Sequence, residues 1–215
     1  MAGYYDSFPD WSDKLAPRIV KALQSRKFDA YYCKTADEAR EKALELMPEG
    51  SSVSWGGSLS IRQIRLTEAV SKGNYQVIDR DLAKSPEERH ELMRKAFTCN
   101  TYLSSANALS EDGEFVNVDG QGNRVAAITF GPDSVIIVMG MNKVVKSLQD
   151  AYNRARSYAG PLNTVRIGTQ TPCATTGSCI NCKSAGSACS YIVTTRLSNV
   201  QGRIKVILVG EVLGL

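Results

Sequence analysis

Hydrophobic residues recur at helical spacing near the start of the chain. After Ser12, the residues Leu15, Ile19, Val20 and Leu23 would share one face of a helix, because a period of about 3.6 residues brings every third or fourth side chain to the same side. The pattern predicts an amphipathic helix in this region.

Two further helices are predicted by their start signals. Thr35 and Glu38 match a capping box, and apolar residues follow them at helical spacing. The stretch SPEE at 85–88 places proline in the first turn and an acid three residues after the cap. We therefore expect helices to begin near residues 35 and 85.

Short β-rich runs alternate with these helices. The runs are residues 28–33, 52–55, 75–79, 101–104, 135–139, 191–195 and 204–209. The stretches VIIVM and VILV are apolar on consecutive positions, as expected for strands covered on both faces of a mostly parallel sheet. The alternation predicts a three-layer α/β domain. FVNVDG at 115–120 alternates instead and predicts a hairpin or an excursion beside the main sheet.

The same pattern suggests how the chain is divided. We expect residues 1–35 to form a helical N-terminal appendage, which is also a candidate contact for a homodimer. Residues 36–215 are expected to form one α/β domain that includes a cysteine loop at 173–189.

Composition and charge narrow the class of partner. The net charge of +4 is spread over mixed-sign segments without a block of Lys or Arg, which argues against nucleic acid as the main partner. The N-terminus lacks a basic stretch followed by an apolar one, and no apolar run approaches the ~20 residues of a membrane span. We therefore expect a cytoplasmic protein with no membrane partner.

Polar turns follow several predicted strands, and ligands of open α/β sheets bind at the carboxyl ends of the strands. The first turn is Gly56-Gly57-Ser58, between a strand and a helix. Glycine lets the backbone approach a ligand, and a helix start offers free N–H groups to a phosphate or carboxylate. An ordinary strand-to-helix turn has the same residues, so both interpretations stay open.

The second turn region is dense in compact hydrogen-bonding side chains. Its candidate ligand-binding residues are Asn107, Asn117, Asp119, Gly120, Gly122, Asn123 and Arg124. This set favours a pocket for a polyhydroxy compound or a carboxylate, although Asn, Asp and Gly are also common in turns for backbone reasons alone. Glu111 and Asp119 are the candidate general bases.

The third turn is Asn142-Lys143, after a buried strand that ends near Gly140. We expect a helix to open here and to place an ammonium group beside helix N–H donors, where an anion would bind. The alternative is a solvated lysine on a helix, which is the commoner position for this residue type.

The remaining chemically reactive residues stand alone. His90 is the only histidine and lies in a charged helix, remote in sequence from the glycine-rich turns. We expect it to be solvated rather than catalytic. Cys33 and Cys99 have apolar and aromatic neighbours and are expected to be buried for packing.

Four of the six cysteines lie in one loop, Cys173-x5-Cys179-x2-Cys182-x6-Cys189. Cytosolic thiols are kept reduced, and four thiolates suit an iron–sulfur cluster or tetrahedral zinc. With one Cys-x2-Cys knuckle, the spacing matches neither a zinc ribbon nor a bacterial ferredoxin. We expect a metal centre, an iron–sulfur cluster ahead of zinc, with free thiols or disulfides as the alternatives.

Five motifs occur in order between residues 35 and 215: SWGGSLSIRQI, ANALSEDGEFVNVDGQGNRVAAITFGP, VIIVMGMNKVV, TPCATTGSCINC and RIKVILVGEVLGL. Together they resemble the LUD domain family of lactate-utilisation proteins. The resemblance implies a Rossmann-like fold similar to ribose-5-phosphate isomerase, glucosamine-6-phosphate deaminase and the CoA transferases. It also implies that the three turns form one ligand mouth, without assigning a catalyst.

The resemblance also has a departure. Family members in the three-part lactate-oxidising complex include a longer subunit with a ferredoxin-like tail. This chain ends at Leu215 without that tail and carries its clustered cysteines inside the domain. It therefore resembles the short, stand-alone branch of the family.

Three functions stay open on these grounds. The first is a subunit or relative of an L-lactate-oxidising system, an oxidoreductase component for a 2-hydroxy acid whose cluster passes electrons to a protein partner. The second is an isomerase or transferase for sugar phosphates or acyl-CoA, with a structural zinc. In both, the ligand is a small anionic metabolite. The third is a non-enzymatic redox sensor or binding module.

Overall fold

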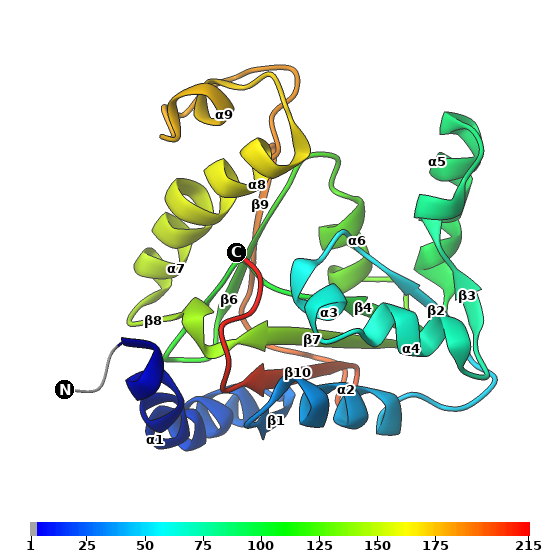
Figure 1. Cartoon of the computed structure of the whole chain (residues 1–215). Helices are drawn as coiled ribbons and strands as arrows, with labels where there is room; N and C mark the ends of the chain where they lie inside the picture. The colour runs from blue at the N-terminus through cyan, green and yellow to red at the C-terminus, as the bar shows by residue number, and fades with distance from the viewer. Residues whose placement is uncertain (1–3) are drawn as a thin grey trace.

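A six-stranded sheet lies at the centre of the computed structural model, which describes residues 4–215. In spatial order its strands are β1 (Asp29–Cys33), β10 (Ile204–Val209), β7 (Ser134–Gly140), β4 (Thr101–Ser104), β2 (Ser52–Trp55) and β3 (Gln76–Ile78). Every neighbouring pair is parallel (Figure 1). The central strands β7 and β10 are buried along almost their whole length, as their uninterrupted apolar runs predict.

Both faces of this sheet are covered. One face packs against α2 (Ala36–Glu45), α3 (Leu59–Gln63) and α4 (Leu66–Lys72). The opposite face packs against α1 (Tyr4–Ser25), α6 (Asn123–Thr129) and a second, smaller sheet. The expected three-layer α/β fold with a mostly parallel sheet is therefore confirmed.

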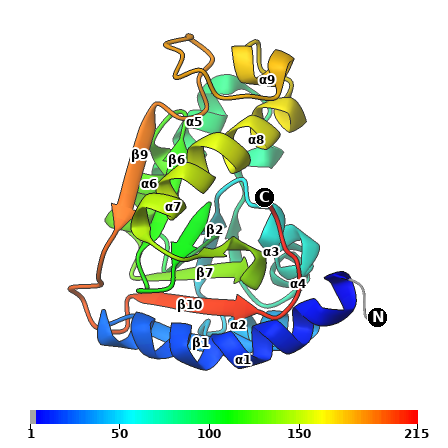
Figure 2. The same cartoon turned by 90° about the vertical axis from the view of Figure 1, so that its left-hand side faces the viewer.

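The second sheet contains four short strands. Their order is β8 (Val144–Val145), β5 (Ala108–Ser110), β6 (Phe115–Asp119) and β9 (Tyr191–Thr195). β5 and β6 form an antiparallel hairpin, and β9 pairs with the other edge of β6 (Figure 2). The segment FVNVDG thus lies beside the main sheet, as expected. The sequence pattern does not predict β5 and β8, which are too short to carry a periodic signal.

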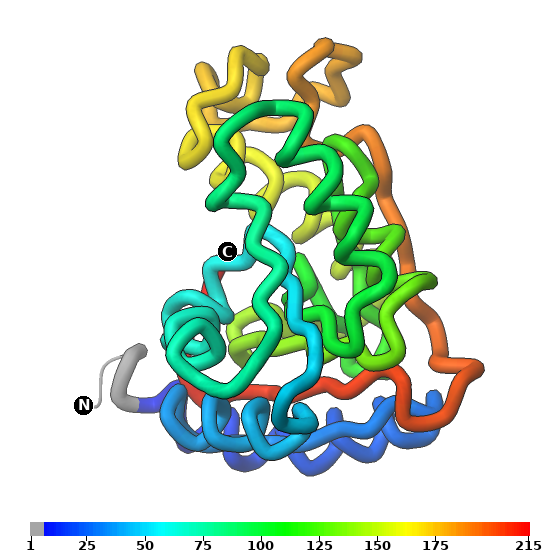
Figure 3. Tube along the Cα trace, turned by 90° about the vertical axis from the view of Figure 1, so that its right-hand side faces the viewer, coloured from blue at the N-terminus to red at the C-terminus, as the bar shows by residue number. Residues whose placement is uncertain are grey.

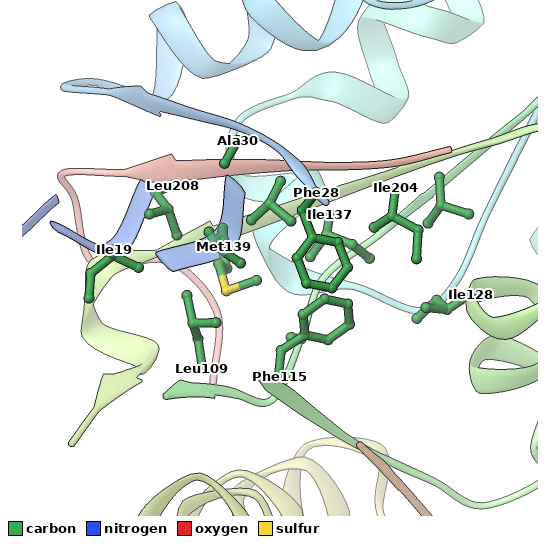
Figure 4. Close-up of a cluster of buried hydrophobic side chains, with 14 of the residues drawn as sticks. Ile19, Phe28, Ala30, Leu109, Phe115, Ile128, Ile137, Met139, Ile204 and Leu208 are labelled. Carbon is green, nitrogen blue, oxygen red and sulfur yellow. The ribbon is translucent and has the colours of Figure 1, made fainter. Parts of the chain in front are cut away.

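The larger hydrophobic core joins the two sheets (Figure 4). Ile137 and Met139 of β7 lie in one buried cluster with Leu109 and Phe115 of the second sheet. The rings of Phe28 and Phe115 are tilted at 44° with centroids 5.5 Å apart, a contact that contributes about 0.5–1.5 kcal/mol beyond area burial. This packing fixes the position of the β5–β6 hairpin, and hence of the polar turns at its ends.

A long bent helix packs on the outer side of the second sheet through small residues. It runs through α7 (Leu148–Arg154), the π-helical turn η4 (Ala155–Ala159) and α8 (Gly160–Ile167). Pro161 has no N–H to donate to the preceding turn, which explains the irregular segment just before it. The chain then forms α9 (Pro172–Thr176) and the cysteine loop, at the end of the molecule away from α1 (Figure 3).

The N-terminal segment belongs to the same packed body. Ile19 and Leu23 of α1 are fully buried in the larger core, and β1 pairs with β10 along its whole length. Within residues 4–215, the expected boundary at residue 35 therefore separates no appendage, because α1 and β1 complete the core and the sheet. Residues 1–3 of that expected segment lie outside the described residues.

The predicted helix starts are confirmed. Between β3 and β4 the chain forms η1 (Arg80–Leu82), α5 (Pro86–Lys95) and η2 (Ala96–Thr98). Ser85 Oγ accepts a hydrogen bond from Glu88 N, and Thr35 Oγ1 accepts one from Glu38 N, each at 3.2 Å. Across residues 4–215, the helices are too short or too polar to cross a membrane.

Candidate functional site

The carboxyl ends of three central strands meet at one edge of the sheet. Gly56-Gly57-Ser58 follows β2, Ser105 follows β4, and Lys143 lies just after β7. A cleft of about 620 Å³ opens here, with α8 and residues 185–188 of the cysteine loop forming further parts of its wall. This cleft is the candidate ligand site, because ligands of open α/β sheets bind at this edge.

The cleft brings together most of the residues that the sequence singles out. The predicted residues in its lining are Gly57, Ser58, Asn107, Asp119, Gly120, Asn123, Arg124 and Lys143. Gly56, Asn117 and Gly122 lie behind this lining and contact it. Asn142 also lies outside the lining, where its Oδ1 accepts a hydrogen bond from Leu213 N at 3.1 Å and holds the last segment in place.

Positive charge dominates the lining. Its cationic residues are Arg62, Arg80, Arg89, Arg124, Lys143 and Arg166, and its acidic side chains are Asp81 and Asp119. Both carboxylates accept hydrogen bonds from groups of the same chain. Burial, together with the charge of Arg62, lowers the pKa of Arg166. A concave site with this balance attracts anions.

Lys143 is the most deeply buried of these cations, at 3% exposure. Its Nζ donates hydrogen bonds to Ser60 Oγ and Ser105 Oγ, both at 3.0 Å, and to the carbonyl of Ala106 at 3.2 Å. In the described part of the chain, no ion pair joins Lys143 to a carboxylate. The fold therefore orients this group without neutralising it.

The protonation of Lys143 follows from that environment. Burial, and then the positive charges of Arg154 and Arg124, lower the pKa of Lys143 to about 7, because a charged ammonium is poorly solvated there. Its protonated form lacks a counter-charge, and its neutral form is a base. Lys143 can therefore pair with an anion or accept a proton near neutral pH.

The local structure around Lys143 differs from the expected helix. Met141–Lys143 forms a single 3₁₀ turn, η3, and Val144–Val145 continue directly into β8, which pairs with β5. The prediction that Asn142 and Lys143 open a helix is wrong, since the two β-branched valines extend the chain into the second sheet. The next helix, α7, begins only after the capping box of Ser147.

A second cationic group in the cleft surrounds Asp81. This carboxylate accepts hydrogen bonds from Arg62 Nη2 at 2.7 Å and from Arg89 Nη1 at 2.9 Å. Arg80 Nε is buried without a hydrogen-bond partner in the described structure and lies 3.9 Å from the same carboxylate. Arg80 also lines the cleft, so its guanidinium is placed to donate to an oxyanion there.

The guanidinium of Arg124 is hydrogen-bonded within the chain through both of its terminal nitrogens. It donates to the side chains of Asn117 at 2.6 Å and Asn107 at 3.2 Å, and to two backbone carbonyls. Asp119 accepts from four backbone N–H groups at the start of α6, at 3.1–3.2 Å. Since both oxygens of Asp119 are occupied in this way, it is poorly placed to act as a general base.

Two glycines allow close approach around this network. A Cβ at Gly56 would lie 2.9 Å from Arg124 Cδ, and a Cβ at Gly120 would lie 3.0 Å from the carbonyl oxygen of Ser187. Both distances are shorter than ordinary van der Waals contact, so a side chain at either position would displace a neighbour. The two glycines thus shape the cleft without touching a ligand through side chains.

The other single candidates lie away from the cleft. Glu111 is outside the lining and forms ion pairs with Arg18 and Lys146. His90 is exposed on α5, and Cys33 and Cys99 are buried, as expected for all three. Glu111 is consequently not a base for chemistry in this cleft.

The four loop cysteines line one small cavity of about 20 Å³. They are Cys173, Cys179, Cys182 and Cys189, all free thiols. Hydrogen bonds with Ser184 lower the pKa of Cys182. Within residues 4–215, no three Cys, His, Asp or Glu side chains are arranged around a common metal position. The metal centre in this loop therefore stays a prediction.

Several cleft residues have no local sequence signal. Arg80, Arg89 and Arg166 come from separate polar stretches, in which an arginine is usually solvated. Arg62 lies only four residues after Ser58, within the helix that follows the glycine turn. Its place one turn into that helix is the signal that could have identified it.

The chain is similar to a known protein family and to several solved structures. The model of the family described as LUD domain matches residues 16–209. No curated protein matches the chain. A solved DUF162 family protein from Deinococcus radiodurans is similar over 92% of this chain and 97% of its own, at 13% identity and a TM-score of 0.53.

Two other solved structures are similar over about half of this chain. Ribose 5-phosphate isomerase A from Neisseria gonorrhoeae has 19% identity and a TM-score of 0.35, over 54% of this chain and 56% of its own. The eIF2B beta subunit from Chaetomium thermophilum has 17% identity and a TM-score of 0.39, over 54% of this chain and 44% of its own. Because the family match covers most of the sequence, the chain belongs to the LUD domain family of lactate-utilisation-related proteins.

Proposed function

We propose that the cleft binds a small anionic metabolite, and that this metabolite is a 2-hydroxy acid or the corresponding 2-oxo acid. The observation that supports this proposal is the environment of Lys143, a buried cation in the cleft lining without a carboxylate partner in the described chain. A ligand carboxylate would supply the missing counter-charge. Ser60 and Ser105 hold the ammonium in place for it.

Such a ligand suits a component of an L-lactate-oxidising system. Oxidation of a 2-hydroxy acid to the 2-oxo acid releases two protons and two electrons, so it needs a base and an electron acceptor. In its neutral form Lys143 could accept one of these protons, and the ammonium formed in this way would then pair with the carboxylate of the 2-oxo acid. In this proposal the electron acceptor would be an iron–sulfur cluster held by Cys173, Cys179, Cys182 and Cys189, which would pass the electrons one at a time to a protein partner. Zinc, the alternative metal for this loop, has no redox chemistry and would be structural. Iron, zinc and sulfide analysis of protein purified without oxygen tests this cofactor.

A second candidate is an isomerase or transferase that acts on a sugar phosphate or an acyl-CoA. It is favoured by the size of the cleft, about 620 Å³, together with the arginines around Asp81. This volume exceeds what a three-carbon acid fills, and grouped arginines are typical of phosphate sites. In this function the Arg80 side chain would bind the phosphate and Lys143 would face the reacting end.

Titration calorimetry on the full chain separates the two candidates. The ligands are L-lactate, pyruvate, ribose 5-phosphate and acetyl-CoA. We expect L-lactate or pyruvate to bind, and Lys143→Met to weaken that binding at least tenfold, about 1.4 kcal/mol, because the counter-charge is lost. The matched control is Lys146→Met, since Lys146 is exposed and pairs with Glu111 outside the cleft.

Each result has a defined meaning. Binding of ribose 5-phosphate or acetyl-CoA without binding of either acid would replace the first candidate by the second. Equal weakening by Lys143→Met and Lys146→Met would contradict a specific role of Lys143. No binding of any of the four ligands would contradict both candidates.

A further inference from the structure

We infer that the cysteine loop is a metal-responsive wall of the anion cleft: binding of a thiophilic metal ion by its four thiols changes the shape of the cleft and its affinity for anions. The anion part of this inference rests on the proposed function. The metal part rests on the loop alone.

The loop and the cleft share a wall. Ala185, Gly186, Ser187 and Ala188 lie between the last two loop cysteines in sequence, and all four line the cleft. Gly160, Ser187 and Ala188 line both the cleft and the small cavity that the four thiols enclose. The two cavities are therefore separated by one layer of residues.

Direct contact links this wall to the floor of the cleft. The carbonyl oxygen of Ser187 rests against Gly120, where a Cβ would lie 3.0 Å from it and 3.4 Å from the Cα of Ala188. Gly120 directly follows Asp119, whose carboxylate holds the start of α6. A displacement of Ser187 is consequently transmitted to the turn that positions Arg124.

The thiols are gathered but not yet in a metal-binding arrangement. All four line one cavity, yet no three are placed around a common metal position in the described structure. Zinc requires its sulfur ligands at about 2.3 Å in a tetrahedron. As it stands, the cavity of about 20 Å³ is large enough for one ion, and a larger iron–sulfur cluster would require the loop to open further. Metal binding must therefore draw the cysteines together and move the segments that carry them.

One of those segments is the shared wall. Cys189 is tied to Ser187, because Cys189 N donates to Ser187 Oγ at 3.3 Å and the Sγ lies 3.4 Å from the same oxygen. Cys179, on another part of the loop, accepts a hydrogen bond from Arg156 Nη2 at 3.7 Å. Drawing Cys189 toward the other thiols pulls on Ser187, and by thermodynamic linkage an anion bound against Ser187 must in turn alter metal affinity.

The first experiment titrates Zn²⁺ into reduced, chelator-treated full-length protein. We expect one Zn²⁺ per chain, with affinity reduced at least tenfold in the double variant Cys179→Ser, Cys182→Ser. Cys99→Ser is the matched control, because Cys99 is buried elsewhere with its thiol bonded to backbone carbonyls. Circular dichroism of all variants checks that they fold. Zn²⁺ binding that persists in the double variant would overturn the metal site.

The second experiment measures the cleft with and without Zn²⁺. Calorimetry uses sulfate as the probe anion, and amide hydrogen exchange follows residues 120–122. We expect Zn²⁺ to change the sulfate dissociation constant at least threefold and to slow exchange at 120–122, with neither effect in the double variant. Bound Zn²⁺ that changes neither quantity would overturn the coupling. If sulfate binds in neither state while exchange still responds, the metal-driven change of the wall stands, and the anion part of the inference fails together with the proposed anion site.

Discussion

Arg124 and Lys143 are two cations of the same cleft that are paired in opposite ways. Arg124 stands at the start of α6, surrounded by side-chain and backbone oxygens, with the carboxylate of Asp119 3.7 Å from its Nε. Lys143 stands after β7, where, within residues 4–215, neutral oxygens alone accept its hydrogen bonds. The cation at the start of α6 thus has a carboxylate beside it, whereas the cation after β7 has none within the described residues.

This difference suggests different roles for the two residues. A buried charge with its partners in place contributes to a fixed structure, whereas a buried charge without a counter-ion costs stability until something neutralises it. We therefore assign Arg124 to positioning the polar turns and Lys143 to contact with the ligand. The predictions below test this assignment, beginning with the largest expected effect.

Replacing Arg124 by Met should strongly destabilise the fold. The variant leaves Asn107, Asn117 and two carbonyls without their donor, and removing one partner of a buried charged network costs about 3–5 kcal/mol. Urea unfolding followed by circular dichroism measures the loss. Arg166→Met is the control, with an expected change within about 0.5 kcal/mol, because Arg166 is exposed and its side chain, as far as residues 4–215 are described, hydrogen-bonds to Asn163 alone.

The opposite result would break the comparison. If Arg124→Met kept wild-type stability and lost only anion binding, Arg124 would be a ligand contact like Lys143. The network of asparagines would then be a consequence of the site rather than its support.

The sequence predicts the central sheet well because two-sided burial leaves a strong local mark. The runs VIIVM and VILV identify β7 and β10, since a strand covered on both faces needs apolar residues at every position. β5 and β8 have three and two residues, too few to show a period. Their pairing depends on where the larger core places the hairpin, which no local pattern encodes.

The site is predictable only where it follows strands. Lys143 and the turn at Gly57 can be located because they directly follow buried segments of the sheet. Arg80 and Arg166 come from stretches with ordinary polar composition, and tertiary packing alone brings them to the cleft. Whether a cation is paired is likewise set by distant residues, so sequence could not distinguish Arg124 from Lys143.

A side chain at Gly56 should destabilise the fold less than the loss of Arg124, because it disturbs the hydrogen bonds of Arg124 without removing them. In Gly56→Ala the new Cβ would lie 2.9 Å from Arg124 Cδ and 3.0 Å from the hydroxyl of Tyr102. Overpacking of this kind costs about 1–3 kcal/mol, which thermal unfolding and urea titration can measure. Gly186→Ala is the matched control, because a Cβ there would lie 3.9 Å from its nearest neighbour, Thr171 Cγ2, which is ordinary van der Waals contact. Unchanged stability in Gly56→Ala would mean that Arg124 can shift without loss.

The smallest predicted effect concerns the unpaired cation, and it appears as a pH dependence. Burial lowers the pKa of Lys143 to about 7, so the ammonium is present below that pH and is lost above it. Sulfate keeps a constant charge over this range and should bind progressively more weakly from pH 6 to 8.5, by at most about tenfold per unit. Lys143→Met should show a flat profile, and Lys146→Met should keep the wild-type slope.

The lowered pKa of Lys143 also determines whether the free energy of unfolding rises or falls with pH. Between about pH 7 and the ordinary lysine value of 10.5, the unfolded chain holds a proton on this residue that the folded chain has released. The free energy of unfolding should therefore rise with pH in this window for the wild type relative to Lys143→Met, as urea titrations at matched pH values would report. If the free energies of unfolding of the two proteins changed with pH in the same way, a counter-charge within the fold would keep Lys143 protonated. The contrast with Arg124 would then be lost.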